Sequence, residues 1–292
     1  KSPLLITGSR CHAEEIRWLH CGPSALQKRS VKLVPNRIAG MTCLQAVFWD
    51  VDGTLADTEL KGHRPAFNRA FADCGLTWNW DEELYAELLS IPGGRQRIRH
   101  YAERLGQSVD SELLARLRHA KQQHYLDVLA SGAVALRPGV RRLLEELHSV
   151  DVQQWIVTSS GRSSVQSLLQ SMSGELTGIF HGMVTSDDVQ EHKPHPDPYL
   201  LALDLSGANS EAVVVLEDST PGLKAARAAG LRCLLTPSPW DTELERCQHQ
   251  AHAVVDQLGE DVQPASIFKG PPCAQGLITL EYLQLLLSSP LR

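Results

Sequence analysis

The feature that most constrains the fold of this chain is an alternation of short apolar runs with helical segments after residue 138. Strands are expected at 155–158, 182–185, 212–216, 233–235 and 253–255, and helices at 139–149, 162–172, 196–206 and 220–229. This alternation is typical of a parallel sheet covered by helices. Because right-handed crossovers run the strands in one direction, their carboxyl ends meet at one edge, where α/β folds bind ligands.

Another apolar run, Leu44–Trp49, lies ahead of this region and ends in Asp50 and Asp52, followed by Gly53. The alternation of side chains along a strand places both carboxylates on the same side of the backbone. Such a pair at the end of a strand can hold a hard cation. Taken alone, Asp-x-Asp-Gly is more often a surface turn, so the rest of the chain must decide between the two interpretations.

The stretch between these two regions lacks strand patterns and predicts four amphipathic helices, at 65–74, 81–89, 96–105 and 110–130. Glycines that follow the first, second and fourth of them stop those helices. The fold class is therefore α/β with a helical insertion. The expected organisation is a core of residues 41–57 and 138–262, interrupted by a helical cap of residues 58–137.

The two ends of the chain are expected to lie outside this organisation. Residues 1–40 are rich in Lys and Arg but contain only Glu14 and Glu15 as acidic residues. They predict a leader that is disordered or foreign to the natural protein, with an organelle transit peptide as the alternative. A cytoplasmic location follows, or the plastid stroma if the leader is a transit peptide. Residues 263–292 are expected to form a linker and a final helix at about 278–287.

Composition excludes several classes of function. The chain has 28 basic and 34 acidic residues and a net charge of −6, which does not suggest a nucleic-acid partner. Its 7 cysteines are odd in number and lack C-x-x-C spacing, which argues against a disulfide framework and a structural zinc. No apolar run approaches the roughly 18 residues of a membrane helix. We expect a monomer with no nucleic-acid or membrane partner.

The expected strand ends carry side chains that suit one reaction, namely Asp50 and Asp52, Thr158-Ser159-Ser160, Lys193, and Glu217-Asp218. One carboxylate can attack phosphorus, and a second can move a proton between the leaving group and water. Hydroxyls, backbone N–H groups and a lysine can stabilise the phosphoryl oxygens. The remaining acidic residues can hold Mg²⁺. Together these groups predict metal-assisted phosphoryl transfer.

The motifs resemble the haloacid-dehalogenase superfamily, in its phosphatase and phosphomutase branch. The matching stretches occur in the same order and are Asp50-Val-Asp52-Gly-Thr54, Thr158, Lys193-Pro194 and Leu216-Glu-Asp-Ser219. The resemblance implies a Rossmann-like parallel sheet core with an inserted cap. It also implies that Asp50 is the nucleophile and Asp52 the general acid/base. Dehalogenases need no second aspartate, so Asp52 favours phosphate over halide chemistry.

The same resemblance assigns roles to the later motifs. It implies that Thr158 and Lys193 hold the phosphoryl group. It also implies that the Asp50 carboxylate, the Asp52 carbonyl and Asp218 bind Mg²⁺, with Glu217 assisting as a ligand or through water.

Within the superfamily, the cap resembles that of the β-phosphoglucomutase-like group. Five stretches look like CbbY-type phosphatases, which remove a phosphate from xylulose-1,5-bisphosphate: Asp57-Thr-Glu59, Gly62-His63-Arg64, Pro92-Gly-Gly-Arg95-Gln-Arg97-Ile98, Ala135-Leu-Arg-Pro-Gly139 and Leu216-Glu-Asp-Ser219. The implied function is Mg²⁺-dependent hydrolysis of a small sugar phosphate, such as a pentulose bisphosphate, through an aspartyl phosphate. The alternatives are a phosphomutase of the β-phosphoglucomutase type and a non-catalytic binding protein on the same fold.

A bisphosphate substrate implies a second phosphate site. The candidate substrate-binding residues are Glu59, His63, Arg95, Arg97, Ser159, Ser160 and Arg162. Each arginine of the cap could instead be a solvated side chain at a helix start, and His63 could lie on a helix surface. Trp78 and Trp80 are expected to pack inside the cap more readily than to line the pocket. The histidines at 181, 192 and 195 fit no zinc spacing and are expected in loops.

Overall fold

The structure is a computed structural model that describes residues 43–91, 93–172, 176, 178–241 and 243–288. The expected leader, residues 1–40, therefore lies outside the described residues. In this part of the chain, seven strands form one sheet in the order β3-β2-β1-β4-β5-β6-β7. The strands are β1 (Ala46–Trp49), β2 (Gln153–Val157), β3 (Gly182–Val184), β4 (Val213–Glu217), β5 (Arg232–Leu235), β6 (Ala253–Val255) and β7 (Ile267–Lys269).

The first strand lies at the centre of the sheet, where β2 and β4 flank it in parallel register. Phe48 pairs with Trp155 on one side and Val215 on the other. β1 through β6 all run in parallel, and only β7 is antiparallel to its neighbour β6. The predicted parallel sheet is confirmed, and its central strand is the one that delivers Asp50 to the sheet edge.

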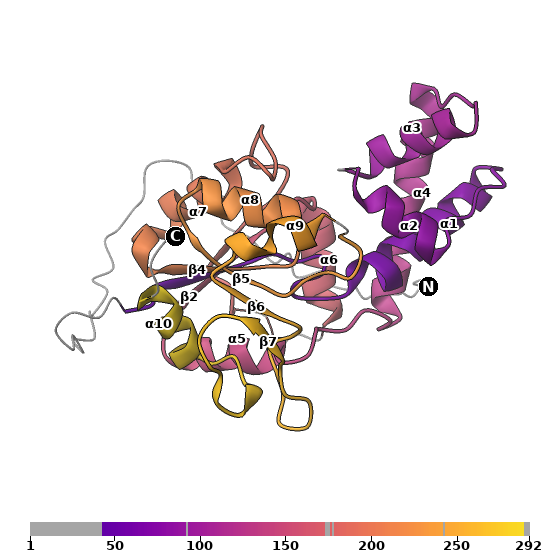
Figure 1. Cartoon of the computed structure of the whole chain (residues 1–292). Helices are drawn as coiled ribbons and strands as arrows, with labels where there is room; N and C mark the ends of the chain where they lie inside the picture. Colours follow the sequence, from indigo (N-terminus) through magenta and orange to yellow (C-terminus); the bar gives the residue numbers. More distant parts are fainter. Residues whose placement is uncertain (1–42, 92, 173–175, 177, 242, 289–292) are drawn as a thin grey trace, which may run out of the picture. The chain divides into compact units, whose positions relative to one another are not determined.

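Two layers of helices cover the sheet (Figure 1). On one face α5 (Val140–Ser149), α6 (Arg162–Ser171) and α10 (Leu280–Ser288) share a buried cluster with Val47 and Trp49. On the other face α7 (Asp197–Ser206), α8 (Thr220–Ala228) and α9 (Leu244–Cys247) pack with Ala46 and Phe48. Because successive strand residues point to opposite faces, a continuous apolar strand such as β1 is what a doubly covered sheet requires.

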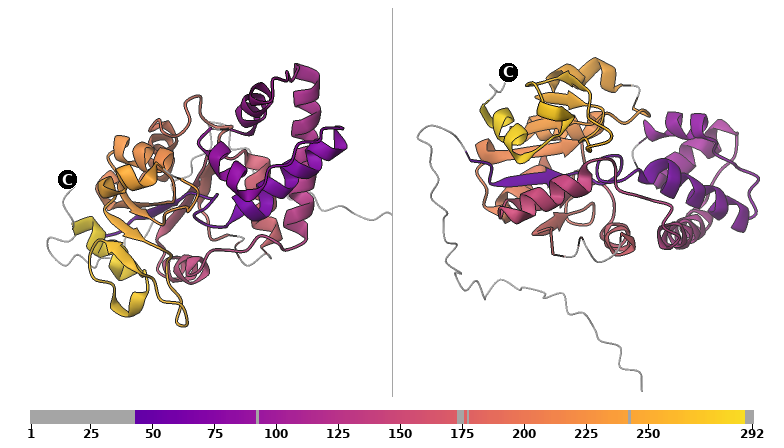
Figure 2. Two further views of the ribbon diagram at one scale, coloured as in Figure 1. Left: turned by 45° about the vertical axis from the view of Figure 1, so that its right-hand side comes forward. Right: turned by 90° about the horizontal axis from the view of Figure 1, so that it is seen from below.

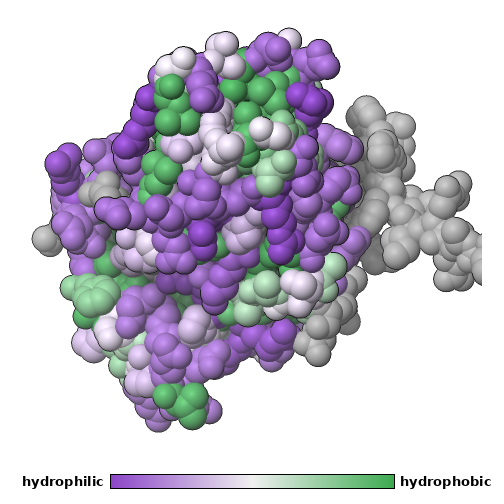
Figure 3. All heavy atoms as spheres, turned by 90° about the vertical axis from the view of Figure 1, so that its right-hand side faces the viewer, coloured by the Kyte–Doolittle hydropathy of each residue, from purple (hydrophilic) through white to green (hydrophobic). Residues whose placement is uncertain are grey.

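The helical insertion is also confirmed. It contains the π-helix η1 (Glu59–His63), α1 (Arg64–Asp73), α2 (Glu82–Leu89), α3 (Gly94–Arg104) and α4 (Ser111–Ala130). Asp81 and Asp110 begin α2 and α4 by accepting hydrogen bonds from Leu84 N and Leu113 N. The side of the molecule that carries these helices has a mainly hydrophilic surface (Figure 3).

The cap has an apolar core of its own, built from aromatic rings. Trp80 is fully buried there, and its ring centroid lies 4.7 Å from that of Phe71 and 4.9 Å from that of Phe67. Trp78 is also buried and packs edge-on against Phe71 and Tyr101. Both tryptophans therefore stabilise the cap, and neither lines the pocket described below.

The two connections between cap and core run side by side (Figure 2). Ala56 and Leu136 form an antiparallel bridge, and Arg137 N donates to Leu55 O at 2.9 Å. The Arg137 guanidinium then donates to the carbonyls of Gly53, Thr236 and Asp256, which follow three different strands. The base of the cap is thereby fixed to the sheet edge that carries the polar strand ends.

The final segment contains more structure than a linker and a helix. The predicted helix is present as α10, and Ile278, Leu283 and Leu286 are fully buried in the core cluster. Sequence reasoning missed β7, because Phe268 and Lys269 are exposed and give this strand no apolar pattern. No helix in the described part of the chain is long and apolar enough to cross a membrane.

Candidate active site

A pocket of about 1210 Å³ lies where the carboxyl ends of the core strands meet η1, α3 and α4 of the cap. The residues predicted from the sequence that line it are Asp50, Asp52, Glu59, His63, Arg95, Arg97, Thr158, Ser159, Ser160, Lys193 and Asp218. Glu217 lies behind this surface and is fully buried. Arg162 is the predicted residue that the structure places elsewhere, since its guanidinium binds both carboxylate oxygens of Asp188 at 2.7 Å.

Asp50 directly follows β1 and is paired with Lys193. The Lys193 ammonium donates to Asp50 Oδ1 at 2.7 Å, to Val157 O at 2.7 Å and to Glu217 Oε1 at 2.6 Å. The Lys193 side chain is only 4% exposed. Because these three bonds use all three donors of the ammonium, Lys193 is held in one position beside Asp50.

Asp50, Glu217 and Asp218 form a carboxylate cluster, in which each residue offers an oxygen within 4.8 Å of the others. Among the described residues, no other set of three or more His, Cys, Asp or Glu side chains is placed to share a cation. The close approach requires Gly53, because a Cβ at that position would lie 2.0 Å from Asp218 Oδ2. Gly53 also has a φ of +90°, which favours glycine.

Glu217 is held from several sides. Tyr199 Oη donates to Glu217 Oε1 at 2.5 Å, and Ser219 Oγ donates to Oε2 at 3.2 Å. The carboxylate rests against the first turn of α8, where a Cβ on Gly222 would lie 1.9 Å from its carboxyl carbon. Tyr199 also places its ring beneath the Lys193 ammonium, 5.1 Å from the ring centroid. Glu217 and Tyr199 therefore fix the position of Lys193.

With all three carboxyl groups ionised, the carboxylate cluster would carry more negative charge than Lys193 can balance. Burial raises the pKa of Asp50 to about 8, with Lys193 opposing the shift and Glu217 adding to it. Burial, followed by the charges of Asp50 and Glu217, raises the pKa of Asp218 well above its usual range. Oxygen-only donors and an excess of negative charge fit a hard divalent cation such as Mg²⁺, which would supply the missing charge.

Asp52 points toward the cap and away from this cluster. Its carboxylate accepts hydrogen bonds from Thr58 Oγ1 and Ser160 Oγ, and His63 Nε2 lies 3.3 Å from Oδ1. Burial alone would raise the pKa of Asp52, but the hydrogen bond from His63, with those from the two hydroxyl donors, lowers it well below its usual range. The two aspartates of one short loop thus have opposite pKa shifts, because hydrogen-bond donors surround Asp52 whereas two other carboxylates lie beside Asp50.

Lys121 of α4 extends the Asp52 contacts into the cap. Its Nζ lies 3.0 Å from His63 Nδ1 and 4.7 Å from the centroid of the Tyr125 ring, which also stacks on His63. An ammonium can only donate, so Nδ1 accepts and Nε2 carries the proton that faces Asp52. Burial lowers the pKa of Lys121 to about 8. Lys121 and His63 therefore connect the cap to Asp52 of the core.

This contact predicts an alkaline limb in the pH profile. As pH rises above about 8, Lys121 loses its positive charge, which weakens its hydrogen bond to His63, so kcat/KM should fall in the wild type. Lys121→Arg should keep the charge and move this limb to higher pH, because a guanidinium does not titrate in that range. Lys269→Arg is the matched control, since Lys269 binds the carbonyls of His249 and Ala251 outside the pocket. Coincident profiles for wild type and Lys121→Arg would contradict the assignment.

The hydroxyl groups after β2 lie beside the aspartates. Thr158 is 2% exposed, and its Oγ1 accepts a hydrogen bond from Ser160 N at 3.0 Å. Ser160 Oγ donates its hydrogen bond to Asp52. Ser159 and Gly161 line the pocket beside it. The turn thus contributes hydroxyl-bearing residues to the pocket that Asp50 also lines, as the binding of a phosphoryl group would require.

The cationic residues of α3 differ in their surroundings. Arg97 is 12% exposed, and its Nε donates to Ile91 O at 2.9 Å while its Nη1 lies 3.8 Å from Glu59 Oε2. Arg95 is exposed and lines the pocket. Arg118 of α4 and Lys224 of α8 are further exposed cations on the pocket wall that sequence reasoning did not select.

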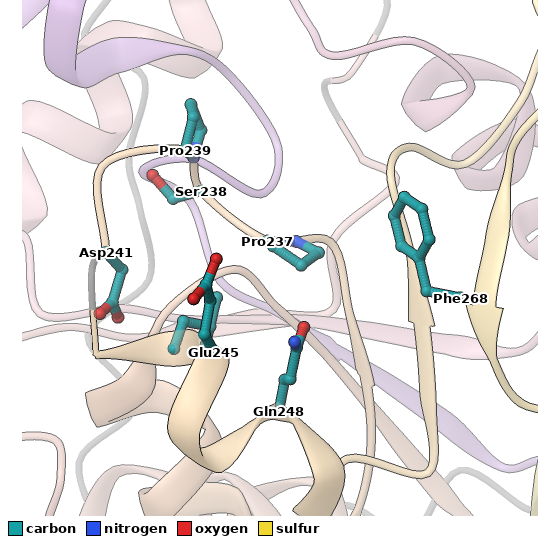
Figure 4. Close-up of a pocket in the computed structure, with 8 residues that line it drawn as sticks. Pro237, Ser238, Pro239, Asp241, Glu245, Gln248 and Phe268 are labelled. Atoms are coloured by element: carbon teal, nitrogen blue, oxygen red, sulfur yellow. The ribbon is translucent and has the colours of Figure 1, made fainter.

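A second pocket, of about 600 Å³, lies between the loop after β5, α9 and β7 (Figure 4). Pro237, Pro239 and Phe268 form its apolar part. Its Asp241 carboxylate accepts a hydrogen bond from Thr220 N and so supports the start of α8. No basic side chain of the described chain lines it, so it offers no counter-charge to a phosphate.

Sequence reasoning missed several residues that orient the site, among them Thr58, Lys121 and Tyr199. A signal existed for Lys121, because it falls between Leu117 and Tyr125 on the buried face of α4 at intervals of four residues. A charged residue on such a face needs a partner, which makes it a candidate for function. Tyr199 and Thr58 look like ordinary core and linker residues in the sequence.

Comparison with known proteins agrees with this geometry. The family model described as haloacid dehalogenase-like hydrolase matches residues 47–236. The protein CbbY of Rhodobacter capsulatus is 42% identical over 198 residues, which cover 68% of this chain and 87% of that protein. The family-model match includes the cap and the core groups from Asp50 to Asp218.

Two solved structures of CbbY from Rhodobacter sphaeroides are also similar. The complex with phosphate has a TM-score of 0.66 at 37% identity and covers 73% of this chain and 94% of that chain. An aspartate-to-asparagine mutant in complex with xylulose-(1,5)-bisphosphate has a TM-score of 0.68 at 36% identity, covering 74% and 96%. The similarity thus includes nearly the whole length of those chains.

Proposed function

The chain belongs to the haloacid dehalogenase-like hydrolases and is a phosphoric monoester hydrolase, and on that premise we propose that it hydrolyses a small sugar bisphosphate with Mg²⁺ through a phosphorylated Asp50. The proposed substrate is a pentulose bisphosphate such as xylulose-1,5-bisphosphate. The observation that carries the proposal is the buried pairing of Asp50 with Lys193 beside the Asp218 carboxylate and beneath a cap pocket.

The residues that would hold Mg²⁺ are Asp50 and Asp218 through their carboxylates and Asp52 through its carbonyl. When bound, Mg²⁺ would neutralise the negative charge of the phosphoryl group and of the nucleophile. Glu217 supports this arrangement from behind through its bonds to Lys193 and Tyr199. Lys193 then supplies the fixed positive charge on the protein side of the transferred group.

In the first step, a carboxylate oxygen of Asp50 forms a bond to phosphorus while the bond between phosphorus and the sugar oxygen breaks. Asp52 gives its proton to the leaving oxygen. Asp52 faces the cap, where a substrate must lie, and the nearby phosphate dianion favours the protonated form that this step needs. Thr158 and the N–H groups of its turn bind the transferred oxygens.

In the second step, the Asp52 carboxylate takes a proton from water, whose oxygen bonds to phosphorus as the bond to Asp50 breaks. The products are inorganic phosphate and the starting enzyme. The lowered pKa of Asp52 suits this step, because a base must be ionised before it accepts the proton. The hydrogen bonds from Thr58 and Ser160 keep the carboxylate in place between the two steps.

The second phosphate of a bisphosphate is assigned to the exposed cations of the pocket. Arg95 is the main candidate, because it lines the pocket from α3 and is not buried among other partners. Arg118 and Lys224 lie on the same pocket wall and can add charge-assisted hydrogen bonds. The complex of the similar CbbY protein with xylulose-(1,5)-bisphosphate supports this substrate class.

A panel of phosphorylated sugars tests the proposal. With Mg²⁺ present, xylulose- and ribulose-bisphosphate should release inorganic phosphate faster than the corresponding monophosphates, because only they reach Arg95. Inorganic phosphate as product distinguishes hydrolysis from phosphomutase activity, which would instead yield an isomeric sugar phosphate. Absence of phosphate release from every member of the panel would overturn the proposed function.

Mg²⁺ should also stabilise the fold in a pH-dependent way. The pKa of Asp50 is raised from 3.8 to about 8, so between these values the metal-free folded chain retains a proton that the unfolded chain has lost. The free energy of unfolding without metal therefore falls as pH rises through this window. Mg²⁺ displaces the proton, so its affinity and the gain in Tm should increase over the same range. Melting curves between about pH 5 and about pH 8, with and without Mg²⁺, measure this, and a pH-independent gain would contradict it.

A further inference from the structure

Beside the catalytic aspartates, three residues of the cap form a buried polar group with no place in the phosphoryl-transfer steps. Glu59 begins η1, Tyr85 lies in α2, and Arg97 lies in α3. Tyr85 is fully buried among the aromatic rings of the cap core. The side chains of Glu59 and Arg97 are 19% and 12% exposed. A largely buried carboxylate at the wall of a substrate pocket needs an explanation, because even partial burial of a charge costs free energy.

The donor groups around Glu59 all lie on the side of one carboxylate oxygen, Oε2. Tyr85 Oη donates to Glu59 Oε2 at 2.5 Å, and Arg97 Nη1 lies 3.8 Å from that oxygen. Arg97 Nη1 also donates to Tyr85 Oη at 3.4 Å, and its Nε is held by Ile91 O. Within the described chain, no hydrogen bond reaches Glu59 Oε1. One carboxylate oxygen is therefore fixed, and the other remains available as an acceptor.

The pocket lining shows where this second oxygen can act. Glu59 and Arg97 line the pocket together with Asp50 and Asp52, whereas Tyr85 lies behind them. A carboxylate oxygen accepts hydrogen bonds from hydroxyl groups and repels phosphate oxygens. The part of the substrate that reaches Glu59 must therefore carry hydroxyls and no phosphate. The Arg97 guanidinium already contacts Glu59, Tyr85 Oη and Ile91 O. Arg95 is therefore the better candidate to bind the distal phosphate.

We propose that Tyr85 and Arg97 are positioning residues that orient Glu59 as a receptor for sugar hydroxyl groups, so that the enzyme selects polyhydroxylated phosphate esters. The inference rests on the proposed phosphatase function. Neither Tyr85 nor the fixed oxygen of Glu59 touches the reacting phosphorus. Their contribution is to hold Oε1 in one direction before the substrate binds, which lowers the entropic cost of recognition.

The test compares two substrates on the full-length enzyme with Mg²⁺. Xylulose-1,5-bisphosphate presents hydroxyls to Glu59, whereas p-nitrophenyl phosphate has none. The measured quantity is the ratio of kcat/KM for the sugar to kcat/KM for p-nitrophenyl phosphate. Tyr85→Phe removes only the phenol oxygen and should lower this ratio at least about tenfold, mainly through a higher KM for the sugar. Arg97→Met should lower the ratio in the same direction.

Tyr101→Phe is the matched control, because Tyr101 packs in the same aromatic core against Trp78 and Trp80. Its ratio should stay within about twofold of the wild type. An unchanged ratio in Tyr85→Phe, or equal losses on both substrates, would overturn the proposal. If Tyr85→Phe does not fold, Arg97→Met replaces it in the test. An unchanged ratio of kcat/KM values in Arg97→Met, or equal losses on both substrates, would then overturn the proposal. A wild type that hydrolyses neither substrate would instead refute the proposed phosphatase function.

Discussion

Replacing Asp50 with asparagine should reduce turnover at least about 10,000-fold while the protein remains folded. An amide oxygen is too weak a nucleophile to attack phosphorus, so the first step cannot occur. The substitution nearly preserves the shape of the side chain, and the amide oxygen can still accept the hydrogen bond from Lys193. Phosphate release at saturating sugar bisphosphate measures the loss, and calorimetric titration should show that the variant still binds the substrate.

Asp204→Asn is a suitable control for this experiment. Asp204 is exposed on α7, so its replacement changes the charge by the same amount without touching the pocket. Its turnover should match that of the wild type. Turnover near the wild-type rate in Asp50→Asn would contradict the role of Asp50, and loss of substrate binding together with turnover would show that the variant had disturbed the pocket.

Removal of the buried cation should affect both activity and stability. Lys193→Met leaves Asp50 and Glu217 without the positive charge that binds them at 2.7 and 2.6 Å. Turnover should fall about 1,000-fold, because no fixed cation remains beside the transferred phosphoryl group. The free energy of unfolding should fall by about 3 kcal/mol, as expected when a buried ion pair loses one partner. Phosphate release and urea unfolding measure the two effects.

A second lysine, Lys269, provides a control that separates the effect on turnover from the effect on stability. Lys269 binds the carbonyls of His249 and Ala251 and lies outside the pocket, so Lys269→Met should lower stability without lowering turnover. Excess Mg²⁺ should recover part of the stability of Lys193→Met, because it supplies positive charge to the same carboxylates. A Lys193→Met variant that retains wild-type turnover would exclude Lys193 from the reaction.

The core of the fold could be predicted because its signals are strong and local. The apolar runs at β1 and β4 are buried on both faces, as parallel strands in the middle of a sheet must be. Asp81 and Asp110 mark the starts of α2 and α4 through ordinary capping. β7 escaped prediction because it is short and exposed, and its position depends on pairing with β6 alone.

The reactive groups of the site could also be predicted, whereas the residues that orient them could not. Asp50 and Asp218 stand at strand ends, and topology brings strand ends together. Tyr85 and Tyr199 have the same sequence appearance as core aromatics, and only the folded chain shows that their hydroxyls bind Glu59 and Glu217. Such contacts depend on the relative placement of helices far apart in the sequence, which local patterns do not encode.

Arg97 illustrates the same limit. Sequence reasoning paired it with Arg95 as a candidate for the distal phosphate, since both begin the same helix. The structure places Arg97 among Glu59, Tyr85 and Ile91 O and leaves Arg95 exposed. Two residues apart on a helix point about 200° apart, so one guanidinium turns inward while the other meets the solvent. We therefore assign Arg95 to the distal phosphate and Arg97 to the positioning of Glu59.

The central claim is that the phosphoryl group passes through Asp50 before it reaches water. The stereochemical course at phosphorus tests this directly, with a substrate whose phosphorus is made chiral by sulfur and oxygen isotopes. Transfer to Asp50 and then to water involves two in-line displacements, and each inverts the configuration. We therefore predict overall retention in the inorganic thiophosphate product. Overall inversion would show a single direct attack by water and would contradict the role assigned to Asp50.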